Sequence, residues 1–210
     1  MRELIDRVND SEGKLDFPEE LKDGPEMVLR GACVGLQKMT YLPGHGVYEY
    51  PYTPESFPWF YDKEQWIKYL DMLVANRMNS LYLWNGHPFA SLVKLEDYPF
   101  ALEVDEETFK KNEEMFSFLT EEADKRGIFV IQMFYNIILS KPFAEHYGLK
   151  TQDRNRPIIP VIADYTRKSI AAFIEKYPNV GLLVCLGEAM CTVEDDVEWF
   201  TKTIIPGVKD

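Results

Sequence analysis

Glu188 is the residue whose type and position most clearly suggest chemistry. It follows an apolar run at 180–186, which predicts a buried strand, and it is flanked by Gly187 and Ala189. A carboxylate at the end of such a strand is partly desolvated, which raises its pKa and suits a general acid. The alternative is a glutamate in the first turn of the next helix, where it would stabilise the helix dipole. Taken alone, the residue leaves these two interpretations about equal.

Polar and aromatic residues also stand at the ends of two other predicted strands. Asn85 and His87 follow a run that ends in Trp84, and Tyr135 and Asn136 follow another. Amide, imidazole and phenol groups can hydrogen-bond sugar hydroxyls. The indole of Trp84 could stack on a pyranose face, although burial of this tryptophan in the core would explain its position equally well. All five are therefore candidate substrate-binding residues.

The segment 40–61 is rich in proline and aromatic residues. Its prolines predict irregular structure, and a loop of this length in a compact domain is usually functional. Because it follows a predicted strand, we expect it at the same end of the sheet as Glu188. Its aromatic side chains could wall a sugar subsite or pack the loop onto the rim of the sheet: Tyr41, Tyr48, Tyr50, Tyr52, Trp59 and Tyr61.

Strands and helices alternate along the chain, and these elements must position the candidate residues. Apolar runs predict strands at 29–36, 80–84, 128–134 and 180–186. Helical spacing of apolar residues predicts helices at 63–77, 106–126 and 166–177, and a fourth striped by Val193, Val197, Phe200 and Ile204. Asp62 is placed to cap the first helix, and Gly127 is placed to end the second.

This alternation predicts an α/β fold with a parallel sheet. An open doubly wound sheet usually has a glycine-rich turn after its first strand, whereas Gly35 leads here into a long loop. Long loops after strand ends favour a (β/α)8 barrel of the TIM-barrel type, whose active site is built from such loops. Four strand–helix units make half of a barrel. We therefore expect residues 28–210 to be the first half of a truncated barrel, and residues 1–27 to end a preceding small α/β domain and form a linker.

Several short motifs resemble the barrel of the β-N-acetylhexosaminidases (family 20). They are Arg30-Gly31, Tyr69-Leu70-Asp71-Met72-Leu73, Asn79 with Leu81-Tyr82-Leu83-Trp84, and Glu122-Ala123-Asp124-Lys125-Arg126-Gly127-Ile128. Leu4-Ile5-Asp6-Arg7 is similar to the last helix of the small domain that precedes such barrels. The resemblance implies a glycoside hydrolase in which Glu188 is the general acid. It also implies that Arg30 contacts sugar hydroxyls or a uronate carboxylate, with a structural ion pair as the alternative.

One position departs from that family. Hexosaminidases carry an adjacent Asp-Glu pair whose Asp orients the acetamido group of the substrate, whereas Gly187 precedes Glu188 here. The α-glucuronidases (family 67) resemble this chain in having a glutamate on the fourth strand without that Asp. Their other catalytic carboxylates lie on later strands, which would fall beyond residue 210.

Charge and hydropathy argue against several classes of partner. The formal net charge is −12, and an acidic surface repels the phosphate backbone of nucleic acids. No apolar run of about 18 residues predicts a membrane span. The residues after Met1 lack the apolar region of a signal peptide, so localisation stays open.

Cysteine and histidine usage predicts neither a disulfide framework nor a metal site. The three cysteines include no CxxC pair, and we expect Cys33 and Cys185 to be buried as small hydrophobic residues. His45, His87 and His146 lack the spacing of zinc ligands. No cofactor is implied.

The sequence thus predicts an exo-acting glycosidase for polysaccharide or glycan fragments, with a uronic acid or a hexosamine as candidate sugars. Glu188 would protonate the leaving oxygen, while a retaining or inverting outcome stays open because it depends on the separation of two carboxylates. The alternatives are a non-catalytic carbohydrate-binding relative and a small open α/β binding domain. We expect the 210-residue chain by itself to be inactive, and its oligomeric state stays open.

Overall fold

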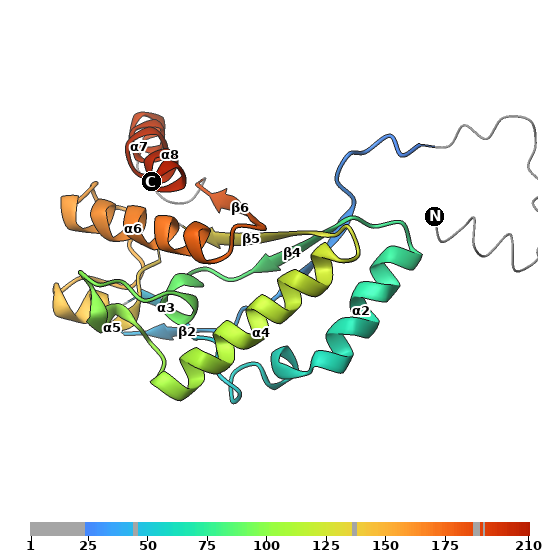
Figure 1. Ribbon diagram of the computed structural model, residues 1–210. Coiled ribbons are helices and arrows are strands. Elements are labelled where there is room, and N and C mark those ends of the chain that lie inside the picture. Colours follow the sequence, from blue (N-terminus) through green and yellow to red (C-terminus); the bar gives the residue numbers. More distant parts are fainter. Residues whose placement is uncertain (1–23, 44–45, 136–137, 187–189, 191) are drawn as a thin grey trace, which may run out of the picture.

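Parallel strands form the centre of the molecule. The computed structural model describes residues 24–43, 46–135, 138–186, 190 and 192–210. A four-stranded sheet in this part of the chain contains β1 (Gly31–Gly35), β4 (Ser80–Trp84), β5 (Phe129–Tyr135) and β6 (Val180–Cys185), in that order. All three strand pairs are parallel (Figure 1). The predicted α/β fold and its strands are confirmed, with boundaries that differ by two residues or fewer.

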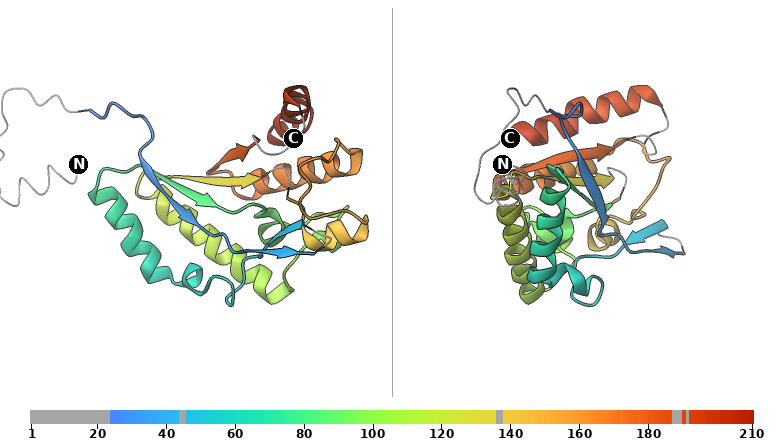
Figure 2. Two further views of the ribbon diagram at one scale, coloured as in Figure 1. Left: turned by 180° about the vertical axis from the view of Figure 1, so that it is seen from behind. Right: turned by 90° about the vertical axis from the view of Figure 1, so that its right-hand side faces the viewer.

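Three long helices cover one face of this sheet (Figure 2). They are α2 (Lys63–Ala75), α4 (Glu106–Asp124) and α6 (Pro160–Lys176). As predicted, the Asp62 side chain accepts a hydrogen bond of 2.9 Å from the backbone N–H of Gln65, which caps α2. Gly127 follows α4 with a φ of 69°, a conformation that glycine adopts without steric cost. α6 begins six residues earlier than predicted, with Pro160 in its first turn.

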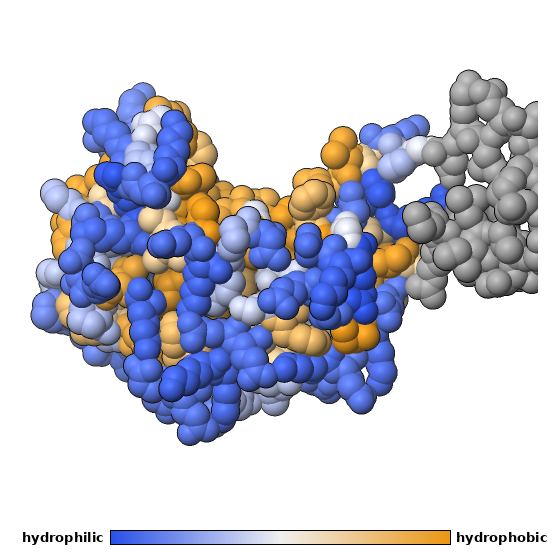
Figure 3. All heavy atoms as spheres, viewed as in Figure 1, coloured by the Kyte–Doolittle hydropathy of each residue, from blue (hydrophilic) through white to orange (hydrophobic). Residues whose placement is uncertain are grey.

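The two faces of the sheet differ in what covers them. Leu81, Leu83, Val130 and Phe134 are buried beneath the helices. Because side chains alternate along a strand, the neighbouring residues of β4 and β5 point to the opposite face. Phe129 on that face is 61% exposed. Figure 3 shows apolar surface in the hollow between α7–α8 and the segment that leads into β1. One face is therefore a core, and the other is an open apolar surface.

The open face explains why one prediction about cysteine is wrong. Cys33 is exposed and Cys185 is partly exposed, and Cys33 pairs in register with Tyr82 of the open face. An apolar run predicts a strand, but it does not reveal whether another element covers both of its faces. Cys191 lies outside the described residues.

The segment after β1 is more regular than predicted. β2 (Met39–Leu42) and β3 (Gly46–Glu49) form an antiparallel pair, and η1 (Pro58–Tyr61) is a 3₁₀ turn. Pro43 lies in the connection between the two strands, and the other prolines of the segment, Pro51, Pro54 and Pro58, follow β3. None of these prolines therefore removes a hydrogen bond from the pair. Three further short elements were not predicted: α3 (Phe89–Leu92), η2 (Pro99–Ala101) and α5 (Lys141–His146).

The final helical segment packs differently from its predicted stripe. α7 (Val193–Trp199), the π-helical turn η3 (Phe200–Ile204) and α8 (Ile205–Lys209) follow one another without a break. Val193 is 73% exposed and Val197 is 56% exposed, whereas Trp199 and Ile204 are buried. A π turn holds more residues than an α turn, so one period of 3.6 cannot describe the whole segment. No helix among the described residues combines the length and hydrophobicity needed to cross a bilayer.

Candidate functional site at the carboxyl edge of the sheet

The four parallel strands end at one edge of the sheet, and most of the candidate residues lie there. Trp84 and Tyr135 end β4 and β5, and Asn85 and His87 directly follow β4. Asn136 and Glu188 lie outside the described residues, so the structure does not place their side chains. The expected proximity of the segment 40–61 to Glu188 is likewise untested.

Asn85 holds three strands together at this edge. Its side-chain amide donates a 2.7 Å hydrogen bond to the carbonyl of Leu36, which follows β1. Its amide oxygen accepts the backbone N–H of His87 at 2.8 Å, and its own N–H donates to the carbonyl of Met133 on β5. The residue is 1% exposed. These contacts give Asn85 a structural role in fixing the turn that follows β4.

His87 belongs to a partly buried polar contact. Its Nε2 lies 2.8 Å from the hydroxyl of Tyr165 on α6, and its ring also lies near that of Phe89. Burial lowers the pKa of His87 to about 3. The imidazole is therefore neutral near pH 7, so it could hydrogen-bond a sugar but would not supply a positive charge.

Trp84 and Tyr135 form an aromatic pair on the open face. Their ring centroids are 4.9 Å apart with an interplanar angle of 76°, an edge-to-face arrangement. Both are partly exposed, and the tyrosine N–H donates to the carbonyl of Gly86. The pair thus presents aromatic surface beside the turn that carries His87, as a sugar-stacking site requires.

Arg30 does not join these residues. It precedes β1, and its Nε donates to the carbonyl of Arg77, which precedes β4. Its Nη1 donates to the carbonyl of Met27 at 2.7 Å. Both contacts lie at the amino-terminal edge of the sheet, the edge opposite Trp84 and His87. The expected sugar contact therefore has no support in this geometry. Among the described residues, the guanidinium bonds to backbone carbonyls and to no carboxylate.

Glu49 is a residue of this edge that the sequence analysis missed. It ends β3 and is 4% exposed, and its Oε1 accepts the backbone N–H of Gly86 at 3.1 Å. Burial raises its pKa to about 7, although the Gly86 N–H and the Gln37 side chain act in the opposite direction. The only signal in the sequence was a single acidic residue between two tyrosines, Tyr48 and Tyr50.

This buried carboxyl predicts a dependence of stability on pH. Folding favours the protonated form of the Glu49 carboxyl. Its contribution to the free energy of unfolding is therefore complete below pH 4.5 and is lost as the pH rises through about 7. Replacing Glu49 with Gln removes the ionisation. We therefore expect the Tm of Glu49→Gln, relative to the unmodified protein, to increase between pH 5 and pH 8.5. A Tm difference that stays constant over this range would contradict the raised pKa.

A second buried carboxyl has a local structural explanation. Burial raises the pKa of Glu103 to about 8, and its Oε1 accepts the backbone N–H of Lys141. Because Lys141 is the first residue of α5, Glu103 satisfies a free N–H at the start of that helix. We assign it no role in substrate binding.

The aromatic residues of 40–61 divide between several surroundings. Tyr52 is fully buried, and the Tyr61 hydroxyl donates to Asn112 Oδ1 on α4, so both pack the segment onto the fold. Tyr48 and Tyr50 form a pair with centroids 5.2 Å apart. Tyr41 is 70% exposed. These residues therefore do not form one wall.

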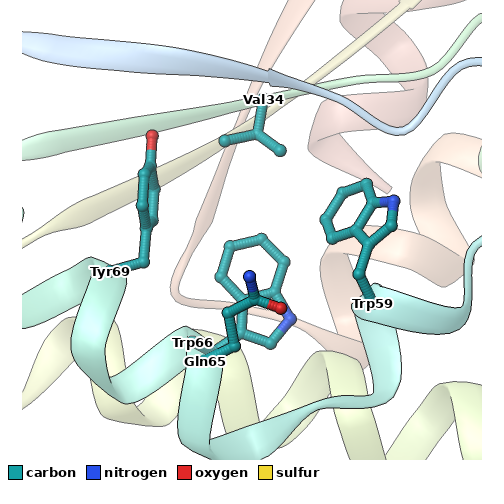
Figure 4. Close-up of a pocket in the computed structure, with 5 residues that line it drawn as sticks. All are labelled: Val34, Trp59, Gln65, Trp66 and Tyr69. Atoms are coloured by element: carbon teal, nitrogen blue, oxygen red, sulfur yellow. The ribbon is translucent and has the colours of Figure 1, made fainter.

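The sixth aromatic residue, Trp59, lines a pocket beside β1. This pocket of about 270 Å³ lies between β1, η1 and α2 (Figure 4), and its lining is Val34, Trp59, Gln65, Trp66 and Tyr69. Val34 points to the helix-covered face, because it pairs in register with buried Leu83. The pocket is thus separate from the aromatic pair on the open face, and its lining contains no carboxylate.

The start of α7 bears on the alternative interpretation of Glu188. The Thr192 side chain accepts the backbone N–H of Asp195, which makes Thr192 the N-cap of the helix. The acidic residues of its first turn are Glu194, Asp195 and Asp196. Glu188 comes four residues before this cap in the sequence and lies outside the described residues, so both interpretations of it stay predictions.

Comparison with known proteins identifies one class of enzyme. No protein-family model and no curated protein matches the chain. Among solved structures, the chain is 84% identical, with a TM-score of 0.91, to a protein described as a GH138 enzyme targeting pectin rhamnogalacturonan II. The match covers 100% of this chain and 24% of that chain.

This match bears on the predicted class in two ways. It supports a glycoside hydrolase, but it gives no support to the resemblance to families 20 and 67. No cluster of three potential metal ligands occurs among the residues that the structure describes. The chain is similar, along its whole length, to a part of a GH138 glycoside hydrolase.

Proposed function

We propose that this chain is part of a glycoside hydrolase that cleaves oligosaccharides of pectin rhamnogalacturonan II. The observation that carries the proposal is the 84% identity to the GH138 enzyme over the whole chain. Because the chain spans 24% of that protein, the activity would belong to a longer polypeptide.

We further propose that residues 28–210 form half of a (β/α)8 barrel. The order of the strands in the sheet is their order in the chain, whereas a doubly wound sheet reverses direction at a switch point. The long helices cover one face, as the outer ring of a barrel does. The open apolar face would become the barrel interior, which further strands would enclose.

In this proposal Glu188 is the general acid, and the residues at the carboxyl edge bind the sugar. The Trp84–Tyr135 pair offers a stacking surface. His87 is partly exposed and has a second ring nitrogen besides the Nε2 that contacts Tyr165, so it would offer a hydrogen bond. Asn136 remains a candidate from its position in the sequence, whereas Asn85 supports the site indirectly. A hexosaminidase mechanism is not proposed, because Gly187 stands where that mechanism needs an aspartate.

The test is hydrolysis by the full-length enzyme that carries this chain. We expect it to release a sugar from rhamnogalacturonan II oligosaccharides, detected by chromatography, and we expect the 210-residue chain alone to release none. Binding of the oligosaccharides by the full-length protein without release would instead support a non-catalytic carbohydrate-binding role. If the full-length protein neither bound these oligosaccharides nor released a sugar from them, this substrate class would be excluded.

A further inference from the structure

The turn Asn85–Gly86–His87 is held from several sides at the carboxyl edge. Asn85 bonds to the end of β1, the Gly86 carbonyl accepts the Tyr135 N–H at 2.9 Å, and the Gly86 N–H donates to Glu49 at 3.1 Å. Of the residues that contact this turn, Glu49 belongs to the hairpin β2–β3. Its carboxyl therefore connects the hairpin to the turn that carries His87.

The fit between Glu49 and Gly86 is close. A Cβ atom added to Gly86 would lie 2.9 Å from Glu49 Oε2 and 2.6 Å from Ile138 Cδ1. Real Cβ atoms do not approach other atoms so closely, so this position accepts glycine alone without movement of its neighbours. The absence of a side chain thus lets the carboxyl reach the backbone of the turn.

The other carboxyl oxygen of Glu49 is buried without a hydrogen-bond partner in the part of the chain that the structure describes. Oε2 forms no hydrogen bond to any described residue, although the side chain is almost fully buried. The groups that face this carboxyl are the Gly86 N–H, the Gln37 side chain and the buried Tyr52 phenol. A buried polar atom without a partner costs free energy.

We propose that Glu49 is a positioning residue of the active site, which holds the Asn85–Gly86–His87 turn, and with it Trp84 and His87, against the substrate. The inference rests on the proposed glycosidase function. Because Glu49 is only 4% exposed and bonds to the backbone of Gly86, it is not placed to contact a substrate itself. It acts through the backbone hydrogen bond, for which the neutral carbonyl oxygen of a protonated carboxyl or of an amide is sufficient.

The experiment compares Glu49→Ala with Glu49→Gln in the full-length enzyme at pH 6. Glu49→Ala removes the acceptor, and a misplacement of about 1 Å can cost on the order of 10²-fold in rate, so we expect kcat/KM to fall by about that factor. Glu49→Gln keeps an acceptor for the Gly86 N–H and should restore most of the activity. Glu55→Gln, the same change at an exposed position of the same segment, is the matched control and should leave kcat/KM unchanged.

Hydrogen–deuterium exchange of the peptide that contains Gly86 tests the contact without reference to activity. We expect its protection to fall in Glu49→Ala and to persist in Glu49→Gln, even if rhamnogalacturonan II is not the substrate. The positioning role is overturned if Glu49→Ala leaves both exchange and kcat/KM unchanged. It is also overturned if Glu49→Gln is as inactive as Glu49→Ala, because the ionisable carboxyl itself would then be required.

Discussion

Replacing Glu188 with Gln in the full-length enzyme is expected to lower kcat by about 10²–10⁴-fold on a substrate with a poor leaving group. Glutamine keeps the shape of the side chain but cannot deliver a proton to the departing oxygen. The position in the sequence supports this role, because Glu188 comes three residues after the end of β6 and four residues before the N-cap of α7. A kinetic assay on rhamnogalacturonan II oligosaccharides measures the effect.

The leaving group separates general acid catalysis from other causes of lost activity. A glycoside with an activated aryl leaving group should lose far less rate, because its departing oxygen hardly needs protonation. Equal losses on both substrates would indicate misfolding or a binding role. Unchanged rates on both would show that the acid lies elsewhere.

Glu194→Gln is a matched control for this variant. Glu194 is an exposed glutamate in the first turn of α7, six residues further along the chain. Its replacement removes a helix-terminal carboxylate without touching the carboxyl edge of the sheet. We expect unchanged kcat on both substrates, and a loss like that of Glu188→Gln would contradict the assignment of the acid to position 188.

Replacing Gly31 with Ala is expected to destabilise the fold by about 1–3 kcal/mol or more, the cost of forcing an atom into a packed site. Gly31 begins β1 and lies opposite Ser80 of β4. A Cβ at this position would lie 2.1 Å from the Ser80 carbonyl oxygen and 2.7 Å from its carbonyl carbon. Backbone atoms of a paired strand cannot rotate away as a side chain can, so the pairing of β1 with β4 must shift. Chemical unfolding of the protein measures the loss.

Gly35→Ala is the control in the same strand. Gly35 ends β1, and a Cβ there would meet no atom within 4 Å. We expect a change within about 0.5 kcal/mol, as for most surface substitutions. A similar loss for both variants would indicate a general effect of alanine in β1. In that case the close approach of Gly31 to Ser80 would not be the cause.

Local patterns in the sequence were sufficient to predict the main elements. β4 was predicted with its observed boundaries, and the start and end signals of α2 and α4 were found at Asp62 and Gly127. Such signals depend on residues close together in the chain, as do the side-chain periods of 2 and 3.6 residues. Short elements such as α3 and α5 span too few residues for a period to be visible.

Periodicity alone could not show which atoms become partners across the fold. Arg30 was expected at a sugar site, but it bonds to the carbonyls of Met27 and Arg77 at the opposite edge. Asn85 was a candidate substrate-binding residue, and its side chain bonds to the carbonyl of Leu36, 49 residues away in the chain. The contacts with Arg77 and Leu36 depend on the pairing of β1 with β4, which places distant backbone carbonyls within reach.

By itself, the sequence determined a parallel α/β fold and a set of polar and aromatic residues at strand ends. The tertiary structure alone decided which face of the sheet is open, and with it the exposure of Cys33 and the edge-to-face pair of Trp84 and Tyr135. It also decided that Glu49 is buried against Gly86 with a raised pKa. The physical reason is that burial and desolvation are set by elements far away in the chain, whereas strand and helix signals are set by near neighbours.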